Sequence, residues 1–470
     1  MSDFQSSGDQ FRSSGHVLID IIADYLDECS QSTLPVTIPL DPDLSYNIWK
    51  DELAKPGLNT VQLFARIIRD SNHLHHPGYI GHQVAVSHPL SLLADLIAGL
   101  LNNGGAVYEM GQVSVAMERA VCRTLTDLIG WDDQSTGIFT SGGTLANLTA
   151  LLTARQVHSK GMYWDEGHGQ TDYAVMVSAE AHYCIARSVK IMGLGSDSVI
   201  TLPVNEKFQL DISAMQETYD QARAKGKTIF AFVGNAGSTG TGSYDDLEAI
   251  GRFCKQHNIW FHVDGAHGGA VLLSKRYKSL IKGLELADSM TLDFHKLLQT
   301  SILCTTLLYK SYTNSHQTFS QGASYLYENH QPEWYQLGKR TFECTKTMMV
   351  LKAYTLLHQL GMERLAKDVD YRYDLAKQFA DILLANKNFE LATYPQSNIV
   401  CFRFVSADQS LEHINLLNQK IRLHLNASGK YYLVQTTIQD KIYLRTSLMN
   451  PDTRLEILLQ LISDIQSFAS

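Results

Sequence analysis

Between residues 136 and 309, short β-branched and aromatic segments alternate with helical patterns, and this alternation constrains the fold of the 470-residue chain more than any other feature. The predicted strands are Thr136–Thr140, Tyr173–Ser178, Ser198–Val204, Thr228–Val233, Ile259–Val263, Ser289–Leu292 and Cys304–Tyr309. Helical patterns lie between most of them, at Thr144–Gln156, His182–Met192, Ile212–Ala224 and Asp245–His257. Because this order is typical of parallel sheets, we predict an α/β domain with a mainly parallel sheet and helices on both faces.

The segments on either side have different patterns. A helix is predicted at Ser14–Glu28, before a proline-rich stretch, and another at Gln112–Ile129. After a long predicted helix at Lys346–Leu360, strands are predicted at Ile399–Val405, Tyr431–Ile438 and Lys441–Ser447, and helices at Leu411–Leu425 and Thr453–Phe468. We therefore predict an N-terminal arm (1–75), a large domain (76–345) and a small C-terminal α+β domain (346–470).

Charge and cysteine content narrow the function and the compartment. The chain has 39 basic and 48 acidic side chains and no dense basic run, which argues against nucleic-acid binding. Its seven cysteines are scattered without a CxxC pair, and its first 15 residues lack an apolar signal core. The most apolar stretch, Pro89–Leu101, contains Asp95 and is too short to span a bilayer. We expect a cytoplasmic protein without a membrane segment.

Three segments at the ends of predicted strands indicate a chemistry. Residues 140–147 (TSGGTLAN) join a strand to a helix through two glycines, which is typical of a phosphate site. In residues 262–269 (HVDGAHGG), Asp264 ends a strand and small residues follow, which leaves room for a flat ring. In residues 293–296 (DFHK), Lys296 directly follows a strand. Pyridoxal phosphate combines a phosphate, a basic ring nitrogen for Asp264 and an aldehyde that forms a Schiff base with Lys296.

Taken together, these motifs resemble the group II pyridoxal-phosphate-dependent amino-acid decarboxylases, which include aromatic-amino-acid, glutamate and diaminobutyrate decarboxylases. TSGGTLANLTAL is similar to the family's phosphate loop, HVDGAHGG to its HVDAAxGG strand end, DFHK to its lysine motif and GSTGTGSYDDL to its Gly-Thr-Thr stretch. The resemblance extends over about residues 60–450. It implies fold type I, the aspartate-aminotransferase-like fold, with pyridoxal phosphate as cofactor and a homodimer whose N-terminal arm could wrap the partner.

The resemblance also implies roles for single residues. The expected cofactor-binding residues are Gly143, Thr144 and His295 at the phosphate, together with His182, Thr239, Asp264, Ala266 and Lys296. Of these, His182 and Ala266 are expected on opposite faces of the ring, and Thr239 near the ring oxygen or the aspartate. A structural alternative for His182 is a cap on the following helix. Arg445, in YLRTSLMNP, and His82 are the expected substrate residues.

Family members are expected to protonate the reacting carbon with a tyrosine on a mobile loop. The candidate stretch is 320–327 (SQGASYLY), where Tyr325 fits best and Tyr327 is the alternative. A tyrosine favours simple decarboxylation to an amine and carbon dioxide, because its phenol can act as a general acid. Packing at a dimer interface is the structural alternative for both tyrosines.

Departures from the family pattern bear on the substrate. Phe294 stands at a common proline position, His267 where many relatives carry Trp or Tyr, and Lys346 and Thr347 where many have two arginines. Gly78, in HHPGYIGHQ, stands where aromatic-acid enzymes often have a bulky ring. We therefore favour a polar or basic substrate, such as 2,4-diaminobutyrate or lysine, over aromatic or glutamate- and aspartate-type substrates.

Three other functions remain open at this point. The same cofactor could support an aldehyde synthase or a transaminase. The H-x-D-x-x-H pattern of His262, Asp264 and His267 could serve a metal-dependent hydrolase, although this would leave Lys296 unexplained, and we expect no metal. A non-catalytic binding protein on the same fold is the last alternative.

Overall fold

The computed structural model describes residues 8–55, 57–167, 169–319, 333–406 and 409–469, and the chain divides into two compact units. The larger unit comprises Gln83–Ala380 and Thr393–Val400. The smaller unit comprises Met1–His82, Asp381–Ala392 and Cys401–Ser470. The division into an arm, a large domain and a small domain with boundaries after residues 75 and 345 stays a prediction.

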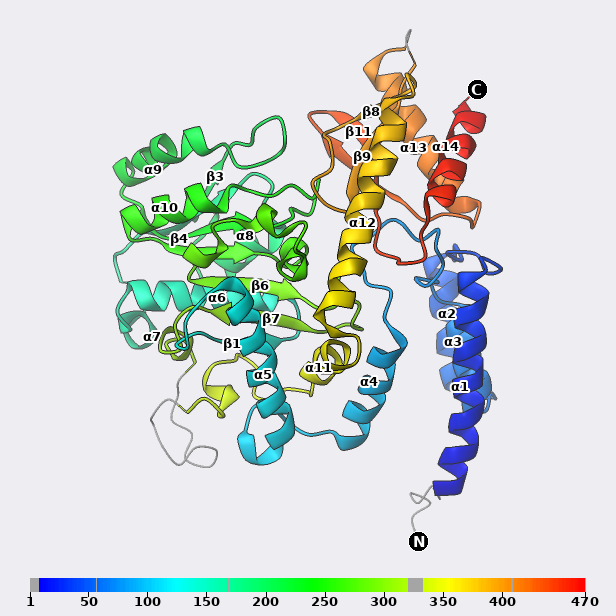
Figure 1. The fold of residues 1–470 in the computed structure, drawn as a ribbon, viewed down its shortest axis with the longest axis horizontal. Helices are drawn as coiled ribbons and strands as arrows, with labels where there is room; N and C mark the ends of the chain where they lie inside the picture. Colours follow the sequence, from blue (N-terminus) through cyan, green and yellow to red (C-terminus); the bar gives the residue numbers. More distant parts are fainter. Residues whose placement is uncertain (1–7, 56, 168, 320–332, 407–408, 470) are drawn as a thin grey trace. The chain divides into compact units, whose positions relative to one another are not determined.

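A seven-stranded sheet forms the centre of the larger unit, in the order β1-β7-β6-β5-β4-β2-β3 (Figure 1). Its strands are β1 (Thr136–Thr140), β2 (Tyr173–Ser178), β3 (Val199–Leu202), β4 (Thr228–Asn235), β5 (Trp260–Asp264), β6 (Ser289–Asp293) and β7 (Thr305–Tyr309). β7 runs antiparallel to β1 and β6, whereas the other neighbouring strands pair in parallel. The predicted mainly parallel sheet is therefore confirmed.

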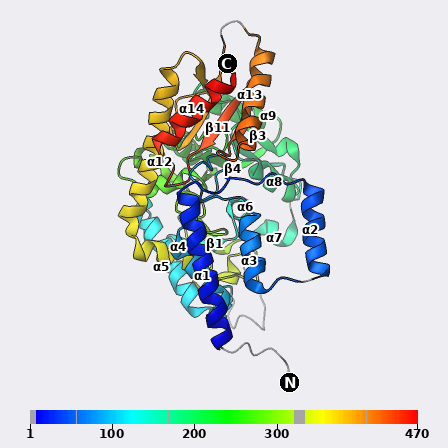
Figure 2. The same ribbon diagram turned by 90° about the vertical axis from the view of Figure 1, so that its right-hand side faces the viewer.

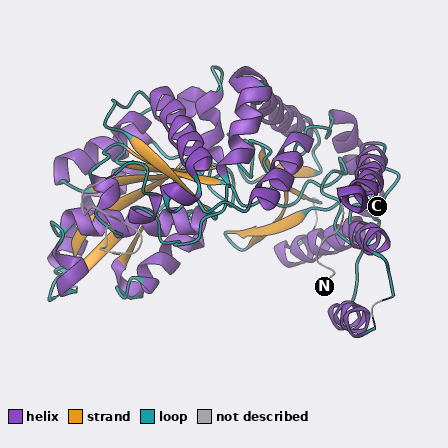
Figure 3. Cartoon of the chain, turned by 90° about the horizontal axis from the view of Figure 1, so that it is seen from below, coloured by secondary structure: helices purple, strands orange, loops and turns teal. Residues whose placement is uncertain are grey.

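Helices lie on both faces of this sheet, as Figure 3 shows for the larger unit. The helices between residues 89 and 384 are α4 (Pro89–Leu101), α5 (Gln112–Ile129), α6 (Gly143–His158), α7 (Met162–Glu166), α8 (Tyr183–Ile191), α9 (Met215–Ala224), α10 (Leu247–His257), α11 (Val350–Gln359) and α12 (Gly361–Leu384). Of these, α5, α6, α9 and α10 pack directly on strands of the sheet. Strand β4 shows why both faces are apolar: Val233 belongs to the core cluster under α6, whereas Phe232 packs on Phe253 of α10 with ring centroids 6.2 Å apart. Successive strand residues point to opposite faces, so a sheet covered on both sides needs continuous apolar strands.

The second sheet has four strands in the order β10-β11-β9-β8, with α13 packed on β11 and against α14 (Figure 2). In the smaller unit, α1 packs against α3. The remaining elements are α1 (Gly8–Ser30), α2 (Pro42–Ala54), α3 (Thr60–Arg69), β8 (Phe389–Leu391), β9 (Ile399–Phe404), α13 (Leu411–Ala427), β10 (Val434–Ile438), β11 (Lys441–Ser447) and α14 (Leu455–Ala469). Within the described ranges, each helix is too short or too polar to cross a lipid bilayer.

The register of the large sheet brings five strand ends to one edge. Asn235, at the end of β4, pairs with Asp264, at the end of β5. Asp293 ends β6 and pairs with Thr305 at the start of the antiparallel β7. Thr305 pairs in turn with Thr140 at the end of β1. Because the carboxyl ends of parallel strands meet at one edge, this is where a ligand site is expected.

Candidate active site

A cavity of about 480 Å³ lies at this edge of the larger unit. All eight expected cofactor-binding residues line it: Gly143, Thr144, His182, Thr239, Asp264, Ala266, His295 and Lys296. The amine of Lys296 and the carboxylate of Asp264 thus share one cavity, as the cofactor hypothesis requires. A larger cavity, about 700 Å³, lies beside Trp260 at the opposite end of β5, and none of the eight residues lines it.

The turn from β1 to α6 has the backbone that an anion site needs. Gly142 has a φ of 143°, a conformation that side chains other than glycine rarely adopt. A Cβ added to Gly143 would lie 3.4 Å from Ala266 Cβ and 3.4 Å from both carboxylate oxygens of Asp293. Thr144 follows in the first turn of α6, whose N-terminal N–H groups and dipole favour a negatively charged ligand.

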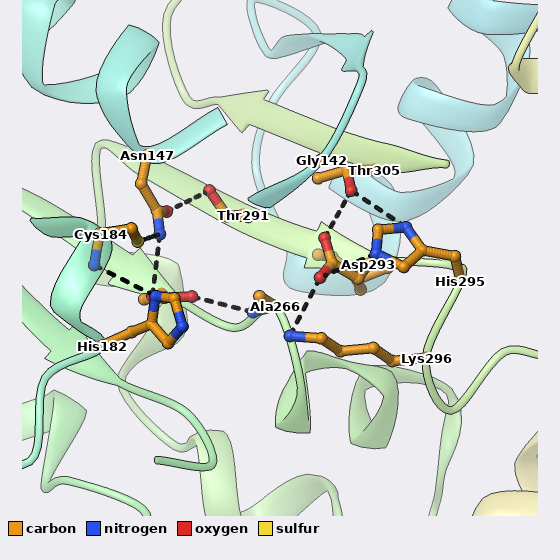
Figure 4. A network of polar contacts seen from close by, with 12 residues as sticks. Gly142, Asn147, His182, Cys184, Ala266, Thr291, Asp293, His295, Lys296 and Thr305 are labelled. Atoms are coloured by element: carbon orange, nitrogen blue, oxygen red, sulfur yellow. Dashed lines mark hydrogen bonds and ion pairs between the residues drawn. The ribbon is translucent and has the colours of Figure 1, made fainter. Parts of the chain in front are cut away.

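Lys296 is held by the carboxylate of Asp293, which was not among the predicted site residues (Figure 4). Its Nζ lies 3.1 Å from Asp293 Oδ2, and His295 Nε2 lies 3.5 Å from the same oxygen. Thr305 Oγ1 donates to Asp293 Oδ1 at 2.5 Å. Burial alone would raise the pKa of Asp293, but Lys296, His295 and the Thr305 hydrogen bond together hold it below its ordinary value. Asp293 is therefore ionised at neutral pH.

Asp264 is fixed through both of its oxygens. Oδ1 accepts the backbone N–H of Ala266 at 3.1 Å, and Oδ2 accepts Asn147 Nδ2 at 2.9 Å (Figure 4). The carboxylate is 8% exposed, and it lines the cavity. Hydrogen bonds donated to both oxygens fix the orientation of the carboxylate.

His182 both caps a helix and lines the cavity, so the structural reading of this residue is also correct. Its Nδ1 accepts the backbone N–H of Cys184 at 3.3 Å at the start of α8. Burial, opposed by the nearby Asp264, lowers the pKa of His182 below its ordinary value. The imidazole is therefore neutral at neutral pH, and its hydrogen is on Nε2.

The residues of the cavity fit pyridoxal phosphate. Asn235 is 3% exposed and lines the cavity, and its side chain contacts the buried Asp245. An amine, a buried carboxylate and the first turn of α6 also line this one cavity. They are the partners that the aldehyde, the ring nitrogen and the phosphate of the cofactor require.

The two expected substrate residues belong to the smaller unit, where they lie close together. Arg445 is buried, and its Nη1 donates to the carbonyl of Gly81 at 3.4 Å. His82 Nε2 lies 3.0 Å from Tyr432 Oη, and burial, together with Arg445 and Arg422, lowers its pKa. The substrate roles of Arg445 and His82 stay predictions.

The backbone packing around Gly78 accounts for a glycine at this position without reference to the substrate. A Cβ added to Gly78 would lie 2.1 Å from the carbonyl oxygen of Lys430 within the smaller unit. Close approach of two backbones therefore explains the glycine, and its small size is weak support for a particular substrate.

Other predictions lie outside the described residues or concern different chemistry. Tyr325 and Tyr327 fall in 320–332, outside the described part of the chain. Both ring nitrogens of His262 are engaged, with Ser289 Oγ at 2.8 Å and Asn147 Oδ1 at 3.0 Å. Across the described ranges, no three His, Cys, Asp or Glu side chains gather as ligands for a metal ion.

The polar residues that line the cavity but were not among the predicted site residues include Asn147, Asn235 and Asp293. Asp293 stands in the DFHK motif, so its position two residues before the His-Lys pair was an available signal. Asn147 and Asn235 give no such signal, because the residues next to them in the fold are distant in the sequence. Asn147 donates to Asp264, 117 residues away, and Asn235 pairs with Asp264 across two neighbouring strands.

Comparison with known proteins agrees with this geometry. Residues 61–405 match the model of the pyridoxal-dependent decarboxylase conserved domain. Human cysteine sulfinic acid decarboxylase is 31% identical over 75% of this chain and 73% of its own length. The L-2,4-diaminobutyrate decarboxylase of Acinetobacter baumannii is 28% identical over 88% of this chain and 84% of its own. The crystal structure of mouse CSAD in apo form has the same fold, with a TM-score of 0.91 and 22% identity over 99% of this chain and 100% of that chain.

The chain belongs to the pyridoxal-dependent decarboxylase family. It is a carboxy-lyase of fold type I that uses pyridoxal phosphate and decarboxylates an amino acid. The predicted family, fold class, cofactor and enzyme class are confirmed. Substrates differ among the relatives, which leaves the substrate of this chain to be proposed.

Proposed function

We propose that Lys296 binds the cofactor covalently, that Asp264 contacts its ring nitrogen, and that the chain decarboxylates an amino acid with a polar side chain. The observation that carries the proposal is the shared cavity of Lys296 and Asp264 at the carboxyl edge of the sheet. When bound, pyridoxal phosphate supplies an aldehyde for the lysine amine and an electron-withdrawing ring that stabilises the carbanion left by carbon dioxide.

The residues around the cavity are proposed to bind different parts of the cofactor. Asp293 holds the free amine of Lys296 in place at 3.1 Å. The first turn of α6, with Gly143 and Thr144, is the proposed phosphate site, because its N–H groups point out of the helix end. His182 is proposed on one face of the ring and Ala266 on the other; both line the cavity, and the small Ala266 leaves room for a flat ligand.

The proton that replaces carbon dioxide is proposed to come from Tyr325, with Tyr327 as the alternative donor. Both tyrosines lie outside the described residues, so this assignment rests on the family resemblance and on the ability of a phenol to donate a proton. Tyr325→Phe should retain cofactor binding and lose clean amine formation. An unchanged amine yield would contradict the role of Tyr325.

For the substrate, the first candidate is a basic amino acid such as 2,4-diaminobutyrate or lysine. Support comes from the diaminobutyrate decarboxylase relative, which matches 88% of this chain. An acidic amino acid is the second candidate. It is favoured by the grouping of His82, Arg445 and Arg422 within the smaller unit, where each guanidinium lowers the pKa of His82. A carboxylate or sulfinate would complement these charges.

We also infer a homodimer. Helix α4 exposes Leu93, Leu96, Ile97 and Leu100 to between 46% and 74%. Contiguous apolar side chains of this kind are typical of a protein interface, and the family resemblance implies a second copy as the partner. Sedimentation equilibrium should give twice the mass of the chain, 105 kDa from 2 × 52.5 kDa, and a monomer at micromolar concentration would contradict the inference.

The test of the proposed function is a screen for released carbon dioxide. The protein, loaded with pyridoxal phosphate, is offered the twenty standard amino acids together with ornithine, 2,4-diaminobutyrate and cysteine sulfinate. Lys296→Ala should abolish release and the visible absorbance of the bound cofactor. Lys282→Ala is the matched control, because Lys282 is 74% exposed and pairs with Glu248 on the surface.

Product analysis separates the remaining alternatives. Hydrogen peroxide or a keto acid as the main product would indicate an aldehyde synthase or a transaminase. Full activity of Lys296→Ala together with loss of activity on chelation would indicate a metal-dependent hydrolase. Cofactor binding without turnover of any amino acid would indicate a binding protein.

A further inference from the structure

Asp264 is the end point of a buried chain of hydrogen bonds. Asn147 Nδ2 donates to Asp264 Oδ2 at 2.9 Å, and Asn147 Oδ1 lies 3.0 Å from His262 Nε2. His262 Nδ1 lies 2.8 Å from Ser289 Oγ, which accepts Trp260 Nε1–H at 2.9 Å. None of the five side chains is more than 8% exposed. These hydrogen bonds link α6, β5 and β6. Figure 4 labels Asn147 together with its neighbours Thr291 and Cys184.

One assignment of hydrogens satisfies every member of this chain. Both oxygens of Asp264 are acceptors, so the amide nitrogen of Asn147 faces Asp264 and the amide oxygen faces His262. His262 must then donate through Nε2, which leaves Nδ1 to accept the hydroxyl of Ser289. The indole N–H of Trp260 can only donate, so the Ser289 oxygen accepts it. Every donor points toward Asp264.

Two further observations show that the order of donors and acceptors in this series of hydrogen bonds cannot be reversed. All four hydrogen-bonding positions of Asn147 are used, because Oδ1 also accepts Thr291 Oγ1 at 2.7 Å and Nδ2 also contacts Cys184 Sγ at 3.4 Å. A turned amide would place its oxygen against the carboxylate of Asp264. Burial, opposed by Asp264, lowers the pKa of His262 to about 4, so its ring is neutral at neutral pH.

Aligned hydrogen bonds in a buried environment polarise one another, and their dipoles add. Here the positive ends all point at the carboxylate of Asp264. We propose that Asn147 and His262 are positioning residues that hold the carboxylate of Asp264 in place and aimed at the ring nitrogen of the cofactor, while Ser289 and Trp260 fix the tautomer of His262. This inference rests on the proposed function, in which Asp264 contacts that nitrogen.

The test compares two cofactors that differ at one atom. Pyridoxal phosphate and its 1-deaza analogue, which has carbon in place of the ring nitrogen, are titrated into the full-length apoprotein, and tryptophan fluorescence gives each dissociation constant. The ratio of the two constants reports the contact between Asp264 and the ring nitrogen, because the aldehyde and phosphate are the same in both. A side chain that only stabilises the fold would change both constants together.

Asn147→Leu retains the volume and removes the amide. We expect the preference for pyridoxal phosphate over the analogue to fall by about tenfold, as for the loss of a hydrogen bond to a charged group, with little change in binding of the analogue. Thr153→Val is the matched control, because Thr153 is a buried residue of α6 that bonds Tyr309 and Thr318. Its ratio should equal that of the unaltered protein.

Ser289→Ala removes one hydroxyl that lies three hydrogen bonds from Asp264 and should lower the ratio by about two- to threefold. It decides the question if Asn147→Leu does not fold: an unchanged ratio in folded Ser289→Ala overturns the proposal. An unchanged ratio in folded Asn147→Leu also overturns it. Asp264→Asn separates this result from failure of the proposed function. If Asp264→Asn loses the preference and Asn147→Leu retains it, only the positioning role fails. If the unaltered protein has no preference, both fail.

Discussion

Replacing Asp293 by asparagine tests how the cavity prepares Lys296 for the cofactor. The Asp293 side chain is 2% exposed, and its Oδ2 lies 3.1 Å from Lys296 Nζ. Both of its oxygens also face the start of α6, since each lies 3.4 Å from the position of a Cβ on Gly143. The same carboxylate therefore attracts the free amine and faces the proposed phosphate site.

The size of the effect of Asp293→Asn depends on which contacts Asp293 makes in the cofactor-free and in the cofactor-loaded protein. Two unit charges 3.1 Å apart attract by about 5 kcal/mol at an effective dielectric constant of about 20. Desolvation offsets most of this attraction, and Lys296, which is 21% exposed, regains water in the variant, so the cofactor-free protein should lose about 1–2 kcal/mol. In the proposed function, covalent attachment of the cofactor uses the same amine, so the loaded protein would not contain this ion pair. It would instead hold the carboxylate near a phosphate of like charge.

Both effects favour the loaded state of Asp293→Asn relative to its cofactor-free state. We expect the variant to bind pyridoxal phosphate about five- to thirtyfold more tightly, measured by equilibrium dialysis at pH 7.5, and its apoprotein to unfold at a lower temperature. Asp288→Asn is the matched control, because Asp288 lies at the opposite end of β6 and accepts Phe261 N–H at 2.8 Å. Unchanged or weaker binding by a folded Asp293→Asn apoprotein would refute the reasoning.

Three further predictions concern the fold and the cofactor site. Lys346→Met should lower the free energy of unfolding by about 3–5 kcal/mol, because it leaves the buried carboxylate of Glu118 without its partner. Urea denaturation measures this loss. The double variant with Glu118→Gln should recover part of it. Neutral His262, with a pKa of about 4 against 6.5 in the unfolded chain, should cost up to about 3 kcal/mol of stability as pH falls from 6.5 toward 4. His262→Gln should flatten that dependence in denaturant titrations, and equal slopes would contradict the shifted pKa. Gly142→Ala should strain the turn between β1 and α6 by about 1–3 kcal/mol, because Gly142 has a φ of 143°. The variant should bind the cofactor more weakly in equilibrium dialysis. Unchanged affinity would show that this turn tolerates a Cβ.

Much of the fold could be read from local pattern. The predicted bounds of β1, β2, β11 and α5 are the observed ones, because each segment has a recognisable strand or helix pattern, and Gly130 directly follows α5. The 24-residue α12 was not predicted. It begins at Gly361, whose φ is 76°, directly after α11, and its buried stripe includes the charged Arg372, so the apolar period is interrupted in the sequence.

The candidate site was predictable where a motif carries it. Lys296, Asp264 and Gly143 follow strands in recognisable patterns, and all three line the same cavity. Asn147 and Asn235 were not predicted, because an asparagine in a helix or at a strand end has many ordinary explanations. Their importance comes from the partners that the fold gives them.

The sequence by itself determined the succession of strands and helices, and it placed the Gly142–Gly143 turn, Asp264 and Lys296 at strand ends, because these features depend on neighbouring residues. Only the tertiary structure decided that Asp293 pairs with Lys296, and that Asn147 joins Asp264 to His262. The physical reason is that a hydrogen bond requires contact within about 3.5 Å, which strand register and helix packing set between residues far apart in the chain.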